Sequence, residues 1–248
     1  MAKLKATAPV SVEALDVHPL PQATETFHPV AHGSLHNMFL QASEAAGLTV
    51  VPAKFQLAPN GEMAIGTYNL IDSRLDATET KAQIGWFNSW DKSCSARMYM
   101  ADEIKWCSNG MVFAMRVLAR KHTANILADL PGGIAKAMHD AVPKFLGNRM
   151  RINTYKSVAL ETKDADHLLM EHWRQGILGD RQLKRAHSEW VEPTYNAFKA
   201  RSVWSFHNAI TESLKSAVVF DAPHLTTLSN DILDAYTNFS EPVFAGAN

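Results

Sequence analysis

The sequence predicts an α+β fold in which an antiparallel β-meander packs against C-terminal helices within a single domain. Apolar residues alternate in much of the first half of the chain, as they do in half-buried strands. From His122 onward they recur mostly at helical spacing, and no linker separates the two halves. Strands followed by helices, rather than alternating with them, indicate an antiparallel sheet.

The predicted strands follow one helix near the N-terminus. Ser34 is a suitable N-cap for that helix, and Gly47 would end it. Asn60-Gly61 lies between two apolar runs, which is a strong hairpin signal. Strands are predicted over 49–57, 62–71 and 81–90, with one or two more over 96–118.

Helices are predicted for the second half of the chain. A helix over 122–146 should break or kink at Pro131-Gly132-Gly133, because both residue types disfavour a helix interior. One or two helices over 164–190 should be interrupted near Gly176–Gly179. Further helices are predicted over 194–216, entered through Pro193, and over 228–236. These patterns divide the chain into an N-terminal arm (1–33), one α+β domain (34–220) and a weakly ordered acidic tail (221–248).

Composition places the chain in the globular class. Hydrophobic residues make up 46% and charged residues 20% of its 248 residues, which argues against disorder and against a coiled coil. No apolar run approaches the roughly 18 residues of a membrane helix. The two cysteines, Cys94 and Cys107, cannot form a disulfide framework. We therefore expect a soluble protein of the cytoplasm that makes no contact with a membrane.

Charge is unevenly distributed along the chain. Residues 105–156 hold nine Lys and Arg against two Asp, a net charge of +7 in a chain whose total is −1. The segment 221–248 carries four acidic residues and no Lys or Arg. This asymmetry fits a polyanion site beside an acidic tail, but it equally fits a solvated basic helix face.

Two polar clusters could carry chemistry. Asn88-Ser89-Trp90-Asp91-Lys92-Ser93 follows a predicted strand, and such residues cap turns through side-chain hydrogen bonds. In a functional interpretation, Asp91 would bind a metal or act as a base. The second cluster is Cys107-Ser108-Asn109-Gly110, whose cysteine could be a nucleophile only with a base such as His122.

Neither a metal nor a cofactor is expected. His28, His32 and His36 recur every fourth residue, but Pro29 and Gly33 argue against the continuous helix that would gather them. The phosphate-binding, dinucleotide-binding, serine-hydrolase and zinc-protease motifs are all absent from the sequence.

Taken together, the clusters resemble the phage/plasmid-like protein family known as domain of unknown function 932. The resemblance covers about residues 27–216. In order, an Asn-Ser-x-Asp-type loop, a Cys-x-Asn pair and a His-Thr helix start match the family. Trp90 and Lys92 depart from it, since many members have His and Gly there. The matching residues are Asn88, Ser89, Asp91, Ser93, Cys107, Asn109, His122 and Thr123, with Trp204, Asn208, Ala209, Thr211 and Glu212 in a later helix motif.

The resemblance implies a mobile-element protein of a bacterial host cytoplasm whose biochemical function is not established. Our first hypothesis is binding or annealing of single-stranded DNA in DNA recombination, with phosphate contacts from cations and base stacking by tryptophans. The acidic tail could compete for that groove or recruit host or phage proteins, and the chain could form a homo-oligomer. The proposed contacts are Arg116, Arg120, Lys121, Arg149, Arg151, Trp86, Trp90 and Trp106.

Two alternatives remain open at this stage. The chain could be a non-enzymatic protein that interacts with a host factor. It could also be a metal-dependent phosphodiester hydrolase that uses Asp91 and His122, with Asn88 or Asn109 in support. A second carboxylate near Asp91 would be needed for a two-metal site, and the sequence indicates none, so we lean towards a protein without enzymatic activity.

Overall fold

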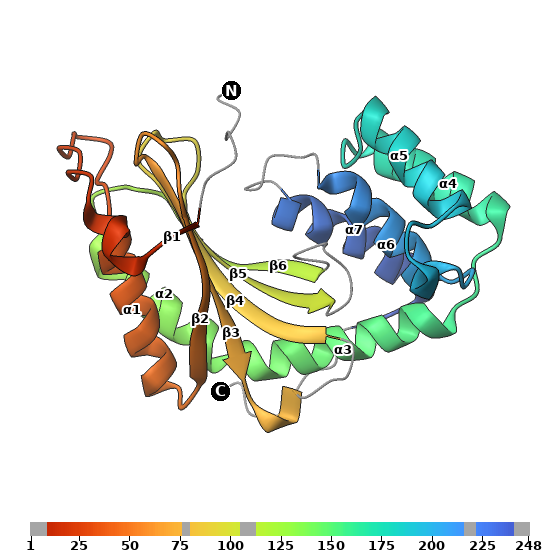
Figure 1. Cartoon of the computed structure of the whole chain (residues 1–248), viewed down its shortest axis with the longest axis horizontal. Helices are drawn as coiled ribbons and strands as arrows, with labels where there is room; N and C mark the ends of the chain where they lie inside the picture. The colour runs from red at the N-terminus through yellow and green to blue at the C-terminus, as the bar shows by residue number, and fades with distance from the viewer. Residues whose placement is uncertain (1–8, 76–79, 105–112, 216–221, 241–248) are drawn as a thin grey trace. The chain divides into compact units, whose positions relative to one another are not determined.

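The computed structural model describes residues 9–75, 80–104, 113–215 and 222–240. It confirms the predicted α+β class (Figure 1). The chain divides into two compact units. Unit 1 comprises the residues up to Asp102 together with Arg116–Val142, and unit 2 comprises Glu103–Met115 and the residues from Pro143 onward. The predicted domain boundaries stay a prediction.

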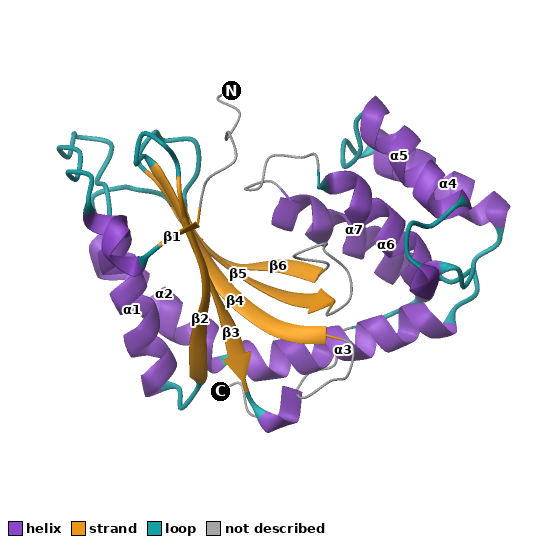
Figure 2. Ribbon diagram, in the orientation of Figure 1, coloured by secondary structure: helices purple, strands orange, loops and turns teal. Residues whose placement is uncertain are grey.

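The described strands form one antiparallel sheet in which each strand lies beside its sequence neighbour (Figure 2). The hairpin predicted at Asn60-Gly61 joins the second strand to the third, and Gly61 adopts a φ of +74° that glycine tolerates best. The strands are β1 (Pro9–Val10), β2 (Thr49–Leu57), β3 (Met63–Ile71), β4 (Thr80–Ser89), β5 (Ala96–Ile104) and β6 (Phe113–Arg120).

Two glycines allow large aromatic side chains to cross the sheet. Gly66 pairs with Trp86, and a Cβ atom on Gly66 would lie 2.5 Å from the indole ring. A Cβ atom on Gly85 would lie 2.4 Å from both the Gly66 carbonyl oxygen and the Tyr99 ring. Trp86 and Tyr99 are both fully buried. Because Gly66 and Gly85 have no side chain, they leave the space that these two rings occupy in the core.

Helix α1 (His32–Ala45) packs on the sheet through Phe39, whose ring stacks on Tyr68 at 4.3 Å. The prediction that Ser34 caps this helix is wrong. The helix begins at His32, and the Asp16 carboxylate accepts from the Gly33 N–H at 3.1 Å instead. An anion is favourable there because a helix N-terminus presents unpaired N–H groups.

Helix α2 (Ile126–His139) continues through Pro131-Gly132-Gly133, so the break predicted there is wrong. The apolar side chains recur every three to four residues and bury one continuous face, formed by Ile126, Leu130, Ile134, Ala137 and Met138. Burial of that face outweighs the cost of Pro131 and two glycines. The chain instead breaks at Asp140.

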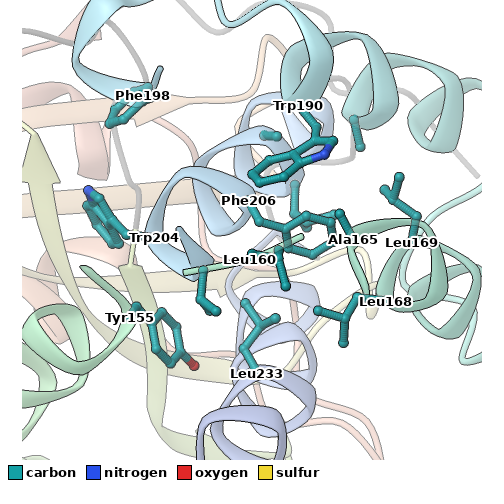
Figure 3. Packing of buried hydrophobic residues seen from close by; sticks show 14 of the residues in the cluster. Tyr155, Leu160, Ala165, Leu168, Leu169, Trp190, Phe198, Trp204, Phe206 and Leu233 are labelled. Carbon is teal, nitrogen blue, oxygen red and sulfur yellow. The ribbon is translucent and has the colours of Figure 1, made fainter. Parts of the chain in front are cut away.

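Unit 2 is built from helices around an apolar core that includes Trp190, Phe206 and Leu233 (Figure 3). The predicted interruption near Gly176–Gly179 is confirmed. The helix predicted over 194–216 is shorter and follows a 3-10 turn, η3 (Asn196–Phe198), while that over 228–236 is longer. The helices are α3 (Ala141–Ser157), α4 (Thr162–Arg174), α5 (Asp180–Val191), α6 (Val203–Leu214) and α7 (Ala222–Thr237).

Helix α7 contributes directly to this core although it falls in the predicted tail. Leu233 is fully buried, and Ser229 lies 2.9 Å from the His172 ring. No helix in the described ranges is both long enough and apolar enough to cross a membrane.

Candidate functional site

The polar loop after β4 belongs to a buried hydrogen-bond network. The Asn88 amide donates to the Val30 carbonyl at 2.7 Å and faces His32 Nδ1 at 2.9 Å. The Asn88 Oδ1 atom lies 2.9 Å from His122 Nε2. Asn88 is fully buried, and it joins the N-terminal segment, β4 and the segment that follows β6.

Every polar atom of Asn88 has a partner when both histidines are neutral. His122 Nε2–H then donates to Asn88, and His32 Nδ1 accepts from it while His32 Nε2–H donates to the Gly61 carbonyl at 3.0 Å. Burial lowers the pKa of His32 to about 4 and also lowers the pKa of His122. The arrangement therefore holds structure together, and neither imidazole carries a positive charge at neutral pH.

Trp90 completes the same network. Its indole N–H donates to the Val30 carbonyl at 2.8 Å, and its ring stacks on the His32 ring at 4.0 Å, nearly parallel. Trp86, four residues earlier on β4, donates to the Tyr68 hydroxyl at 3.1 Å, and that hydroxyl also lies 2.5 Å from His36 Nδ1. Both tryptophans are buried, so neither presents a free ring face to a nucleic-acid base.

The rest of the loop is a capped turn. Ser89 Oγ donates to the Cys94 carbonyl and accepts from the Cys94 N–H, while Asp91 Oδ1 accepts from the Ser93 N–H at 2.9 Å. Asp91 is exposed, and neither a hydrogen bond nor an ion pair joins it to His122 among the described residues. The hydrogen bonds of the loop therefore give no support to the Asp91–His122 pair on which the hydrolase hypothesis depends.

The predicted cations have different environments. Arg116 and Arg120 lie on β6, which is an edge strand of the sheet, and both are exposed, as is Lys121. No described residue forms an ion pair with any of the three. Arg151 is buried and bonds Asp234 at 3.0 Å, and Arg149 is half-buried. Arg151 is therefore committed to the core of unit 2.

The remaining sequence-predicted residues contribute little to a site here. Thr123 is exposed and its N–H donates to the Lys121 carbonyl at 2.8 Å, next to the start of α2. Trp106, Cys107 and Asn109 lie outside the described residues. Over the described part of the chain, no cluster of three or more His, Cys, Asp or Glu side chains could hold a metal ion.

Sequence reasoning missed a pocket in unit 2. It lies between α5 and α6 and has an empty volume of about 210 Å³ including its open mouth. In the sequence, Asn208 and Glu212 stand out only as parts of the later helix motif. The lining residues are Glu189, Pro193, Tyr195, Phe198, Ser205, Asn208, Ala209 and Glu212.

Comparisons with protein-family models, curated proteins and solved structures found no match for this chain. The candidate sites therefore rest on their own geometry.

Proposed function

We propose that the protein binds single-stranded nucleic acid through an edge-strand cation row formed by Arg116, Arg120 and Lys121. The observation that carries the proposal is that all three are exposed and pair with no described carboxylate. Unpaired surface cations keep their full charge available for phosphates.

The spacing along β6 suits a polyanion. Arg116 and Arg120 are four residues apart, so their side chains emerge on the same face of the strand. At about 3.4 Å per residue, their Cα atoms are separated by roughly 14 Å, and Lys121 extends the row. A guanidinium can bind a phosphate through two parallel hydrogen bonds, which favours arginine at such positions.

Binding of this kind would depend on charge and not on base sequence. Trp86 and Trp90 are buried, so the stacking expected from the sequence has no support from these two residues. With three cations and no stacking, affinity should be modest and should fall steeply as salt is added.

The test is a fluorescence anisotropy titration of a labelled 20-nucleotide oligo(dT) at several salt concentrations. The triple variant Arg116→Gln, Arg120→Gln, Lys121→Gln should weaken binding and flatten the log–log salt slope. Each lost phosphate contact on a single strand contributes about 0.7 to that slope, so the full loss is about two.

A matched control replaces Lys163, Arg174 and Lys184, three exposed cations of unit 2, with Gln. It removes the same charge and should leave the slope near that of the wild type. An equal loss in both variants, or no binding at low ionic strength, would contradict the proposal. The second result would favour the alternative of a protein partner in the host.

The resemblance to the phage/plasmid-like family supports a role in the DNA metabolism of a mobile element. That context, like annealing activity and a bacterial cytoplasm, stays a prediction. Duplex DNA and RNA probes in the same titration would show which nucleic acid the row prefers.

A further inference from the structure

Asn208 lines the α5–α6 pocket and carries an acceptor atom that has no donor among the described residues. Asn208 is 2% exposed, and its Nδ2 atom donates to the Trp204 carbonyl at 2.7 Å, which fixes the orientation of the amide. Its Oδ1 atom is fully buried and accepts no hydrogen bond from any described residue. A buried acceptor without a donor costs free energy, so this atom favours a ligand that brings an N–H or O–H group.

Two glutamates, Glu189 and Glu212, line the same pocket as Asn208. Glu212 is 6% exposed and accepts from Arg185 at 2.7 Å through Oε1, while Lys215 Nζ lies 2.7 Å from its Oε2. Glu189 instead accepts from the N–H and hydroxyl of Thr194 and forms no ion pair with a described residue. The Glu189 carboxylate therefore forms no ion pair with a described cation, whereas Glu212 is already paired with two, so Glu189 is the carboxylate of this pocket that can attract a positive ligand.

The walls determine the size and shape of that ligand. Pro193, Phe198 and Ala209 are apolar, and Tyr195 adds an aromatic ring. Much of the empty volume belongs to the mouth, so the enclosed part admits a group of about the size of a water molecule. Apolar walls around a small, polar bottom of the pocket suit a compact cation carried on an alkyl chain.

We propose that the α5–α6 pocket binds a primary ammonium group, carried either by a lysine side chain of a partner protein or by a free alkyl diamine. The ammonium donates to Asn208 Oδ1, its charge is attracted by Glu189, and its alkyl stem lies against Pro193 and Phe198. A quaternary ammonium has no N–H to donate and is too bulky for the enclosed bottom of the pocket.

The direct test is an NMR titration of the ¹⁵N-labelled full-length protein with n-butylammonium. The Asn208 side-chain amide and the backbone amides of α5 and α6 should shift together and saturate. Tetramethylammonium and 1-butanol at equal concentration should not shift them, since the first lacks a donor and the second lacks the charge. Weaker, non-saturating shifts with all three probes would overturn the proposal.

Substitutions at Glu189 and Asn208 test whether butylammonium binding depends on these two side chains. Glu189→Gln removes the unbalanced charge from a half-buried position and should weaken butylammonium binding about fivefold. Glu192→Gln removes the same charge from the exposed end of α5, outside the pocket, and should leave binding unchanged. Asn208→Leu should abolish saturable binding, and an unchanged affinity in both pocket variants would contradict the site.

Two further probes distinguish the sources of the ammonium. Cadaverine represents a free diamine, and Nα-acetyl-lysine-N-methylamide represents a lysine within a protein. Tighter binding of cadaverine favours a free diamine as the ligand, and tighter binding of the lysine analogue favours a partner protein. The edge-strand cation row lies in unit 1, so failure of nucleic-acid binding would leave this result unaffected, and the reverse also holds.

Discussion

Asn88 and His122 are hydrogen-bonded at 2.9 Å although Asn88 lies on β4 and His122 follows β6, two strands that β5 separates in the sheet. The same asparagine reaches the Val30 carbonyl and His32. One buried amide therefore connects three chain segments that are far apart in sequence. Because both of its N–H groups and its oxygen have defined partners, the network specifies one arrangement of this end of the sheet.

Replacing Asn88 by Leu should destabilise the protein. The change leaves the His122 N–H and the His32 ring nitrogen without partners, and a buried unsatisfied group costs about 1–3 kcal/mol. Urea denaturation would measure the loss in the free energy of unfolding. Asn153→Leu, on an exposed position of α3, makes the same chemical change and should stay within about 0.5 kcal/mol of the wild type. Equal effects would show that Asn88 is not a structural centre.

Stability should fall as the pH is lowered from about 6.5 to 4. Burial lowers the pKa of His32 and of His172 to about 4 and that of His207 to about 3. Between those values and the ordinary histidine pKa of 6.5, the unfolded chain binds more protons than the folded chain, so protons favour unfolding. The contribution is fully present above pH 6.5. Urea midpoints measured at pH 7.5, 5.5 and 4.5 would show the decline.

The histidine origin of that pH dependence can be tested separately. His32→Gln should reduce the slope of stability against pH, whereas His167→Gln, on an exposed face of α4, should leave it unchanged. A midpoint that does not move between pH 7.5 and 4.5 in the wild type would refute the prediction.

Gly85→Ala and Gly132→Ala should act in opposite directions. A Cβ atom on Gly85 meets the Gly66 backbone and the rigid Tyr99 ring, so overpacking should cost about 1–3 kcal/mol. A Cβ atom on Gly132 meets no atom within 4 Å, and alanine in the interior of α2 should stabilise by about 0.5–1 kcal/mol. Thermal denaturation of both variants checks the signs. Destabilisation by Gly132→Ala would mean that α2 is not a continuous helix.

Arg151→Ala should weaken unit 2 and not nucleic-acid binding. The guanidinium bonds Asp234 and Asn148 and lies over the Phe239 ring at 5.1 Å. Breaking a largely buried pair costs on the order of 3 kcal/mol, because the partner charge is left behind. Arg120→Ala, an exposed change, should reduce oligo(dT) affinity with little effect on denaturation. The opposite pattern would place Arg151 in the binding surface.

Deleting the chain from Ala222 onward should disrupt the fold of unit 2. The deletion removes Leu233 from the core, Ser229 from His172 and Asp234 from Arg151. Far-UV circular dichroism should show a loss of helix larger than α7 alone accounts for. Ending the chain after residue 240 removes none of the described contacts and serves as the control. Retention of a cooperative transition without α7 would show that this helix is dispensable.

The sequence by itself determined the α+β class, the hairpin at Asn60-Gly61 and the interruption near Gly176–Gly179. These features depend on local signals, namely alternation of apolar residues, a turn dipeptide that tolerates positive φ, and glycines that end helices. Such signals act within a few residues, so they can be read without knowledge of the rest of the chain.

Tertiary structure decided the features that depend on distant partners. Asp16 rather than Ser34 caps α1, and burial of one face carries α2 through Pro131. Trp86 and Arg151 had the residue types of binding groups, but contacts with Tyr68 and Asp234 placed them in the interior. The sequence identifies what a side chain can do. Whether it faces solvent or a partner depends on segments that meet only when the chain folds, because burial and pairing free energies arise from those long-range contacts.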